Sequence, residues 1–162
     1  MRQSRAIALA ASALCFWALM PAAASADATA FIGANTSPAN RLARGFAIGA
    51  GLLIIGFEFE YADTSDDPAA NAPSVKSGTG NVMLQTPVSF YGFQPYFTAG
   101  GGIYHESLGS KDNTGFAVDL GGGVKMSLIG PVRLRVDYRV FNAGGGALSP
   151  AHRFYVGLNV KF

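Results

Sequence analysis

The chain has 162 residues, of which 49% are hydrophobic and 14% are charged, and its formal net charge is +2. This length suits a single domain, and the weak charge gives no reason to expect nucleic acid or another polyanion as a partner. After the first residues, the nearest approach to a membrane helix is segment 47–56, with ten residues and three glycines. A spanning helix needs roughly 20 apolar residues, so this segment is too short to be one.

The chain begins with the features of a secretory signal peptide. Arg2 and Arg5 form a basic start, an apolar run covers residues 6–20, and residues 24–26 (Ala-Ser-Ala) form a small-residue cleavage site. The apolar run falls short of a membrane anchor, and the small-residue exit favours cleavage after Ala26.

We therefore expect residues 1–26 to be removed and residues 27–162 to form one domain. The single cysteine, Cys15, lies in the leader, so the remaining chain can form no disulfide. Loss of the two leader arginines leaves ten basic and ten acidic residues, which gives a net charge of zero.

Eight later segments alternate apolar and polar side chains with a period of two, which is typical of strands with one apolar face. They span residues 28–35, 44–52, 55–61, 80–88, 93–105, 115–126, 132–141 and 151–162. The first, third, fifth and seventh connections are polar and rich in Gly, Pro, Ser, Asn and Asp, whereas the others are short. This predicts an all-β fold, an eight-stranded antiparallel up-and-down transmembrane β-barrel.

Prolines and glycines agree with this arrangement. Each proline after the leader falls in a connection or near a strand end, where a missing N–H breaks no ladder. Glycines inside the strands, such as those at 121–123, are expected to leave room for larger side chains across a narrow lumen. A nucleotide-binding loop is excluded, because Gly49 and Gly51 lack the third glycine of the dinucleotide motif and no P-loop motif occurs.

The last strand carries the clearest alternation. Its apolar face holds Phe154, Val156, Leu158, Val160 and Phe162, the final residue. An open apolar edge of this kind invites aggregation unless the strand is paired on both sides and faces lipid. The pattern therefore favours a barrel in a membrane, with its apolar side chains outside.

Charged residues occupy the other face of several strands. In a barrel of eight, the strand at 55–61 lies opposite the strand at 132–141, so the glutamates of the first face the arginines of the second across the lumen. A buried unpaired charge costs several kcal/mol, so we expect a satisfied network. The predicted lumen network consists of Glu58, Glu60, Asp119, Lys125, Arg133, Arg135, Asp137, Arg139, Arg153 and Lys161.

Aromatic residues gather toward the two ends of the strands, as expected for girdles at the membrane interfaces. The loop-end group consists of Tyr61, Tyr104, Phe116, Tyr138, Phe141 and Phe154. The turn-end group consists of Phe90, Tyr91, Phe93 and Phe162.

A terminal motif carries a resemblance to a known family. Tyr155, Gly157, Val160 and Phe162 occupy the spaced polar or aromatic, glycine, apolar and aromatic positions of a barrel assembly signal. On this motif and the strand pattern, the chain resembles the small eight-stranded outer-membrane β-barrels of the OmpA/OmpX and opacity type. The resemblance implies residence in the outer membrane of a Gram-negative bacterium and recognition of the signal by the barrel assembly machinery.

Enzymatic chemistry has weak support. Among eight-stranded barrel enzymes, the lipid A deacylases pair a His with a Ser two residues later, and His105, Glu106 and Ser107 match that spacing. The pattern is short and arises often by chance. The lipid A palmitoyltransferases have an N-terminal amphipathic helix and a His with an Asp-Ser pair, which the sequence does not show. His152 is expected at the interface rather than in a catalytic site.

Metal binding also has weak support. Asp63, Asp66 and Asp67 lie close in sequence, but their spacing does not match an EF-hand, and acidic loop clusters are usually just solvated. We expect no catalytic residue, no metal site and no cofactor.

We therefore expect a non-enzymatic outer-membrane protein of the cell envelope with a plugged polar lumen and a structural or surface-interaction role carried by its outer loops. Its expected partners are outer-membrane lipids, lipopolysaccharide and, during biogenesis, the assembly machinery, whereas the loop partner is not identified. Two alternatives stay open. One is a lipid A-modifying enzyme that uses His105 and Ser107, and the other is a soluble periplasmic lipocalin-like carrier.

Overall fold

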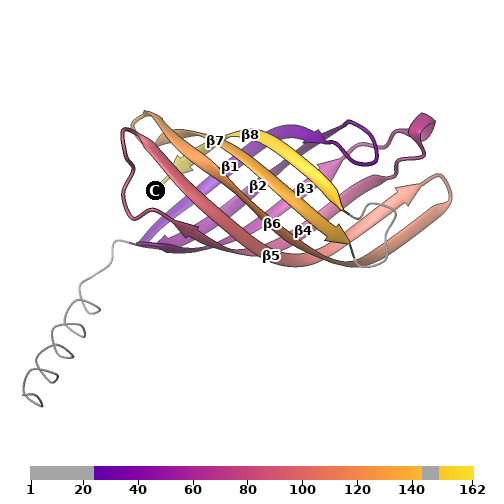
Figure 1. Ribbon diagram of the computed structural model, residues 1–162, viewed down its shortest axis with the longest axis horizontal. Coiled ribbons are helices and arrows are strands. Elements are labelled where there is room, and N and C mark those ends of the chain that lie inside the picture. The colour runs from indigo at the N-terminus through magenta and orange to yellow at the C-terminus, as the bar shows by residue number, and fades with distance from the viewer. Residues whose placement is uncertain (1–23, 144–149) are drawn as a thin grey trace, which may run out of the picture.

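The computed structural model describes residues 24–143 and 150–162, which form a closed barrel of eight strands (Figure 1). The strands are β1 (Ala24–Asn35), β2 (Arg41–Leu52), β3 (Ile55–Thr64), β4 (Ser74–Gln85), β5 (Phe93–Leu108), β6 (Lys111–Ile129), β7 (Val132–Ala143) and β8 (Ala151–Lys161), and a short 3-10 helix, η1 (Pro68–Ala70), follows β3. Each strand pairs antiparallel with its neighbours along the chain, and β8 pairs with β1. The predicted eight-stranded antiparallel barrel is confirmed.

The two ends of the barrel differ. One end carries η1 and the connections at 36–40 and 65–73, and we call it the loop end. The other carries the short turns at 53–54 and 130–131 together with the C-terminus, and we call it the turn end (Figure 1). Among the described residues, no helix is long and apolar enough to cross a membrane.

The start of β1 lies upstream of the predicted start at residue 28. The ladder with β2 already includes Ala24, and the backbone of Ala26 exchanges two hydrogen bonds with Phe162, of 2.9 and 2.8 Å. This stretch has small side chains and no alternation, so the sequence gives no strand signal there. The predicted leader itself, apart from residues 24–26, lies outside the described residues.

The fifth connection also differs from the prediction. The sequence predicts a loop at 106–114, but β5 continues to Leu108 and β6 begins at Lys111, which leaves a two-residue turn. The pairs Leu108↔Lys111 and Ser107↔Asp112 extend the ladder into this hairpin. Apart from Leu108, its side chains are polar on both faces, so the period-two signal disappears although the backbone pairing continues.

Further strand boundaries depart from the prediction, and β3, β6 and β7 end two or three residues later than predicted, at Thr64, Ile129 and Ala143. β4 covers Ser74–Gln85 rather than 80–88, because its first half consists of small and polar residues and Thr86 and Pro87 fall in the turn before β5. β2 begins at Arg41 rather than at residue 44.

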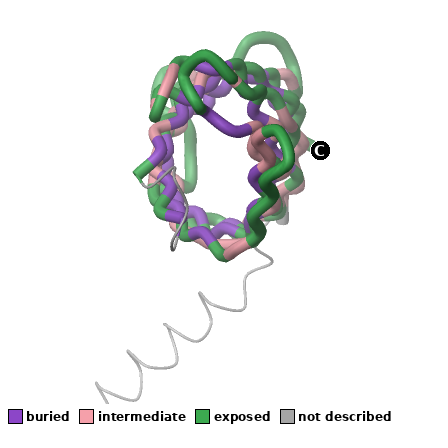
Figure 2. Tube along the Cα trace, turned by 90° about the vertical axis from the view of Figure 1, so that its right-hand side faces the viewer, coloured by how far each residue is buried: buried purple, intermediate pink, exposed green. Residues whose placement is uncertain are grey.

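Side chains alternate between the lumen and the outer surface, and buried and exposed positions alternate along the tube in Figure 2. Phe57, Ile103 and Phe116 point outward with exposed fractions of 64%, 58% and 78%, whereas Arg135 and Arg139 point inward and are fully buried. This is the reverse of a water-soluble barrel, whose surface does not carry a continuous band of large apolar side chains.

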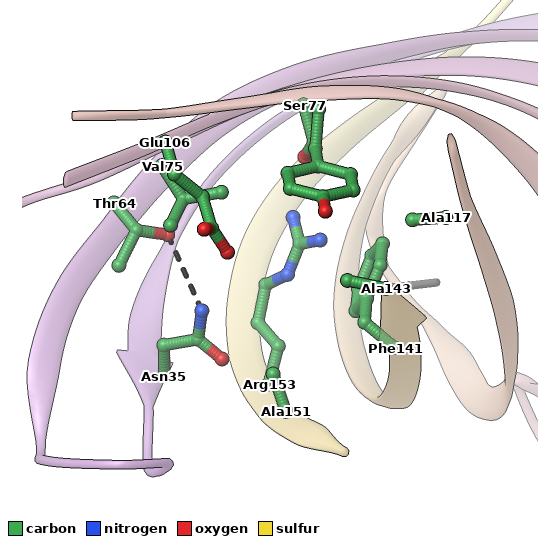
Figure 3. Close-up of a pocket in the computed structure, with 11 residues that line it drawn as sticks. Asn35, Thr64, Val75, Ser77, Glu106, Ala117, Phe141, Ala143, Ala151 and Arg153 are labelled. Carbon is green, nitrogen blue, oxygen red and sulfur yellow. Dashed lines mark hydrogen bonds between the residues drawn. The ribbon is translucent and has the colours of Figure 1, made fainter. Parts of the chain in front are cut away.

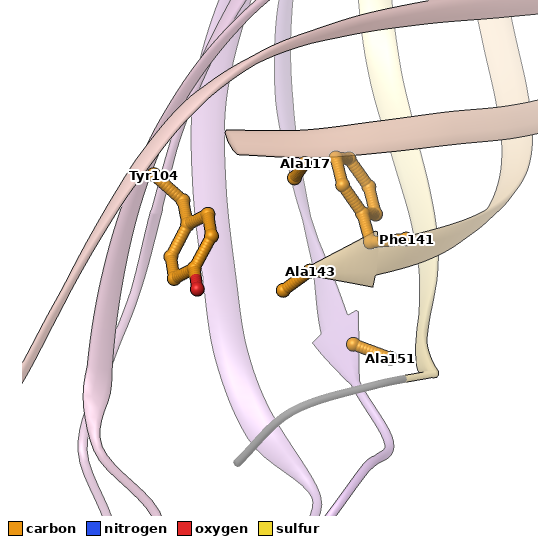
Figure 4. Packing of buried hydrophobic residues seen from close by; sticks show 5 residues of the cluster. All are labelled: Tyr104, Ala117, Phe141, Ala143 and Ala151. Atoms are coloured by element: carbon orange, nitrogen blue, oxygen red, sulfur yellow. The ribbon is translucent and has the colours of Figure 1, made fainter. Parts of the chain in front are cut away.

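Two residues predicted for the loop-end aromatic girdle face inward instead. Tyr104 and Phe141 are buried and form an apolar cluster inside the loop end with Ala117, Ala143 and Ala151 (Figure 4). Alternation explains this position, since Phe141 lies two residues after the inward-facing Arg139. Phe116, Tyr138 and Phe154 are exposed on the outer surface.

Candidate functional site

A charge network crosses the lumen from β3 to β7. Arg135 donates hydrogen bonds to both carboxylate oxygens of Glu58, one of 3.0 Å, and its Nη2 donates to Asp137 Oδ2 at 3.0 Å. Arg139 Nη2 donates to Glu58 Oε1 at 2.7 Å, and its Nε donates to Asp137 Oδ1 at 3.0 Å. All four side chains are fully buried, so each charge depends on the others in place of water.

The network continues toward the loop end through Glu60. Its Oε1 accepts from Arg153 Nη1 at 3.1 Å, and its Oε2 accepts from the Tyr155 hydroxyl at 3.1 Å. Arg139 also lies 3.1 Å from Glu60 and 3.5 Å from Asp119. One arginine therefore joins carboxylates from several strands.

A second cluster closes the turn end around Asp27. Its Oδ2 accepts from Lys125 Nζ at 2.5 Å and from Arg133 Nη2 at 2.9 Å. Arg133 also donates to Asn159 Oδ1 at 2.8 Å and to Gln94 Oε1 at 2.9 Å. Hydrogen bonds and ion pairs therefore connect strands across the lumen both at its centre and at the turn end.

The structure places nine of the ten predicted network residues inside the barrel: Glu58, Glu60, Asp119, Lys125, Arg133, Arg135, Asp137, Arg139 and Arg153. Lys161 is the exception, because β8 runs past the last lumen residue and leaves this side chain exposed at the turn end. The sequence prediction missed several members, among them Asp27, Tyr96 and Tyr155. Tyr96 donates to Asp137 and accepts from Arg135 Nε at 2.7 Å. Alternation along β5 and β8 was the signal that could have placed the two tyrosines on the inward face, whereas Asp27 lies in a stretch without alternation.

The inward-facing charges balance within the described residues. The carboxylates are Asp27, Glu58, Glu60, Glu106, Asp119 and Asp137, and the basic groups are Arg41, Lys125, Arg133, Arg135, Arg139 and Arg153. Equal numbers of opposite charges give the lumen a formal net charge of zero.

A small cavity lies inside the loop end, where Asn35, Glu106 and Arg153 meet the apolar cluster (Figure 3). Asn35 Nδ2 donates to Thr64 Oγ1 at 3.5 Å, and the Arg153 guanidinium lies 4.0 Å from the ring centre of Phe141. Asn35 Oδ1, Glu106 Oε1 and Arg153 Nε have no hydrogen-bond partner among the described residues. Because buried polar atoms are normally satisfied, these three atoms mark where a water molecule could make further hydrogen bonds in an otherwise mostly apolar cavity.

Arg41 connects three backbone segments at the loop end. Its guanidinium donates to the backbone carbonyls of Ser37, Ser65 and Pro73. Burial lowers the pKa of Arg41, although the charge of Glu106 opposes this. Burial likewise raises the pKa of the Glu106 carboxyl, against a hydrogen bond from Asn113 and the charge of Arg41. The two groups are buried outside the apolar band, and their opposite charges attract each other.

The structure separates the three residues considered for catalysis. His105 and Ser107 lie on the outer face of β5, whereas Glu106 points into the lumen. His105 Nδ1 lies 2.8 Å from Thr114 Oγ1. A serine nucleophile needs a base that an acid orients, and the acid of this motif lies on the other side of the barrel wall. His152 Nδ1 lies 2.7 Å from the Tyr138 hydroxyl at the outer surface.

The acidic residues considered for metal binding have other contacts. Asp63 lies 3.6 Å from Arg44, and Asp67 caps η1 by accepting from Ala69 N at 3.1 Å and Ala70 N at 3.3 Å. Within residues 24–143 and 150–162, no three His, Cys, Asp or Glu side chains are grouped to hold a metal ion.

The terminal motif divides between the two faces of β8. Tyr155 points inward and stacks on Phe31 with ring centres 4.1 Å apart, and Gly157 faces the same side. Val160 and Phe162 point outward and are exposed. The role of these residues as an assembly signal stays a prediction.

The barrel is similar to three solved outer-membrane proteins. It aligns with the N-terminal β-barrel domain of Pseudomonas aeruginosa OprF with a TM-score of 0.68 and 14% identity over 85% of this chain and 97% of that one. Neisserial surface protein A gives a TM-score of 0.66 and 17% identity over 86% and 96%. The outer membrane enzyme PagL gives 0.53 and 13% over 83% and 98%.

At these identities the likeness establishes the fold alone. No protein-family model matches the chain, and no curated protein matches it in sequence.

Proposed function

We propose that this chain is a non-enzymatic β-barrel of a bacterial outer membrane, with a plugged polar lumen and a structural or surface-interaction role carried by its loop end. The observation that carries the proposal is the inversion of polarity across the barrel wall. Ion pairs fill the interior, and large apolar side chains cover the exterior. Such a barrel is stable only where lipid covers its outside, because exposed apolar patches of this extent drive association in water.

The same inversion argues against a soluble carrier of the lipocalin type. A carrier of that class holds an apolar ligand inside the barrel and faces water outside. Here the centre holds Arg135, Glu58 and Arg139 in direct contact. An eight-stranded barrel has no spare width for a channel beside such side chains, so the lumen acts as a rigid plug.

The loop end is the surface available for recognition. The orientation follows from the predicted signal peptide and from the general design of outer-membrane barrels, which carry longer loops outside and short turns on the periplasmic side. The similar fold of a Neisserial surface protein supports a role of this kind. Outer-membrane lipids, lipopolysaccharide and the barrel assembly machinery are the partners that this location implies.

The second candidate function is modification of lipid A by His105 and Ser107. PagL, an outer membrane enzyme with a similar fold, favours it. The inward position of Glu106 weakens it, because the histidine of this motif is left without its adjacent acid. The non-enzymatic role is therefore preferred.

Membrane fractionation of cells that express the full chain tests the proposal. The protein is expected in the outer-membrane fraction, and unheated and boiled samples are expected to migrate differently on a detergent gel because the closed barrel stays folded until heated. Recovery in the soluble periplasmic fraction, with no heat-dependent shift, would overturn it.

A further inference from the structure

The outer surface is organised in rows that run across the strands. Residues paired in register place Arg44, Asp63, Lys76, His105 and Thr114 in one outward row near the loop end. The next row toward the turn end contains Phe46, Tyr61, Gly78, Ile103 and Phe116. The row after that contains Ile48, Phe59, Gly80, Gly101 and Val118. The first row is polar, and the other two form the part of the apolar band that lies nearest the loop end.

Large side chains are missing from both apolar rows at the same place. Gly78 and Gly80 face outward on β4, and Gly101 lies beside Gly80 on β5. The side chains of Phe59 on β3 and Ile103 on β5 flank these glycines, with exposed fractions of 53% and 58%. A Cβ atom added to Gly80 would meet nothing within 4 Å. The glycines therefore leave a depression in an otherwise bulky lipid-facing surface.

The part of this depression around Gly78 belongs to a groove that ends on polar groups. The groove is lined by Phe59, Tyr61, Lys76, Gly78, Ile103 and His105 and has a volume of about 350 Å³, within the usual range of about 300–1,000 Å³ for ligand sites. A second apolar groove shares Phe59 with the first, includes Gly80 and continues toward the turn end.

The polar end of the groove carries a free positive charge. Lys76 and His105 are direct partners across β4 and β5, and both are exposed. Among the described residues, Lys76 makes no ion pair, since Asp63 beside it pairs with Arg44. His105 and Thr114 add hydrogen-bonding groups next to the lysine.

We propose that this groove binds one phosphorylated glycolipid of the lipid A type, with an acyl chain over Gly78 and Gly80, its phosphate at Lys76, and its sugar hydroxyls near His105 and Thr114. The proposal rests on the proposed membrane location and names one partner of the barrel wall. Charge complementarity selects an anionic headgroup over a zwitterionic one.

The dimensions of the groove agree with this occupant. Gly80 lies four positions after Lys76, which corresponds to about 13 Å along a strand and to roughly 10 Å along the membrane normal at the usual strand tilt of about 40°. Half of a bilayer's hydrocarbon core is about 15 Å thick. An acyl chain whose headgroup sits at Lys76 therefore contacts the glycines over about two thirds of the depth of its leaflet.

Native mass spectrometry of the purified, detergent-folded barrel tests the proposal. The probes are lipid A and, as a zwitterionic comparison, phosphatidylcholine with acyl chains of similar length. Gly80→Leu fills the second groove, into which the acyl chain continues past Gly78, and Lys76→Gln removes the charge. Ala30→Leu adds the same apolar group to an outward position on β1, and Lys111→Gln removes a lysine from the tip of the β5–β6 hairpin. The heat-dependent gel shift shows that each variant is folded.

We expect the wild-type barrel to retain lipid A in preference to phosphatidylcholine. Gly80→Leu should abolish this preference and Lys76→Gln should weaken lipid A binding roughly five-fold, the size expected for one lysine at an anionic surface. Both control variants should bind as the wild type does. Equal retention of the two lipids, or equal binding by Gly80→Leu and Ala30→Leu, would overturn the proposal. If Gly80→Leu did not fold, the comparison of Lys76→Gln with Lys111→Gln would still decide it.

This result is separate from the test of location. A barrel that fractionates with the outer membrane but shows no lipid preference would remove the glycolipid site and leave the proposed function standing. A barrel found in the soluble fraction would remove the proposed function before any lipid was added.

Discussion

Arg135 and Glu58 span the diameter of the barrel. Their strands, β7 and β3, lie four places apart in a ring of eight, and the guanidinium donates to both carboxylate oxygens. Both side chains are fully buried. A buried ion pair of this kind is stable only while every charge keeps its partners, because each ion has lost its hydration.

Replacing Glu58 by Gln should therefore destabilise the barrel strongly. The substitution keeps the shape of the side chain but leaves Arg135 and Arg139 with less counter-charge, at an expected cost of about 3–5 kcal/mol. Unfolding by denaturant in detergent, followed by circular dichroism, measures this. Asp112→Asn in the exposed hairpin is the matched control, with an expected change within about 0.5 kcal/mol. Equal losses for the two variants would contradict the role of the central network.

An added methyl group should destabilise the barrel at Gly157 and have little effect at Gly80. A Cβ at Gly157 would lie 2.7 Å from the carbonyl oxygen of Ala30 and 2.9 Å from Phe31 Cβ. Gly157→Ala should cost about 1–3 kcal/mol, as is typical of overpacking. Gly80→Ala places its methyl in open space and should leave the free energy of unfolding nearly unchanged. Similar stability for both variants would show that the interior can yield around Gly157.

The sequence predicts the strands well wherever one face is apolar. β5, β7 and β8 begin at Phe93, Val132 and Ala151, as alternation indicates, and the turn at 53–54 lies where it is expected. Prediction fails where pairing continues through polar or small residues, as in the β5–β6 hairpin and the first half of β4. Backbone hydrogen bonds hold those segments, and they leave no periodic signal in the side chains.

The same distinction applies to the candidate site. Charged lumen residues can be predicted because alternation and charge coincide, whereas Tyr96 and Tyr104 cannot be assigned by residue type, since a tyrosine suits either face. The orphaned atoms of the loop-end cavity and the groove at Gly80 depend on which side chains meet across strands. That information comes from the register, which the sequence pattern alone does not determine.

Glu106 should make the stability of the barrel depend on pH. Burial raises its pKa in the folded state above the ordinary value of 4.5, so the folded protein holds this proton more tightly than the unfolded chain does. Below pH 4.5 Glu106 is protonated in both the folded and the unfolded state, so its burial carries no charge-related cost to stability. As pH rises from there through the folded pKa, stability falls, and it stays lower above that point.

Glu106→Gln should remove this part of the pH dependence. The difference in denaturation midpoint between the variant and the wild type, measured at pH 4 and at pH 8, is expected to favour the variant more at the higher pH. A larger advantage at pH 4 would mean that the attraction of the Glu106 carboxylate to the charge of Arg41 outweighs its burial.

His105 and Ser107 should be dispensable for lipid A acylation. Their motif acid points into the lumen, and His105 is already hydrogen-bonded to Thr114. Cells that express the double variant His105→Ala/Ser107→Ala should show the same lipid A mass profile as cells that express the wild type. A change in acylation that the wild type causes and the variant abolishes would establish the enzymatic alternative.

The protein recovered from the outer membrane should begin at Asp27. The small residues 24–26 fit a signal-peptidase site, and cleavage after Ala26 keeps the Asp27 carboxylate that holds Lys125 at 2.5 Å and Arg133 at 2.9 Å. Intact-mass measurement of the purified protein locates this end directly. Ala26→Arg should block processing, because the site requires a small side chain, and the unprocessed chain should appear at the precursor mass. A mature chain that lacked Asp27 would contradict the prediction, since the cluster at the turn end would then have lost its acid.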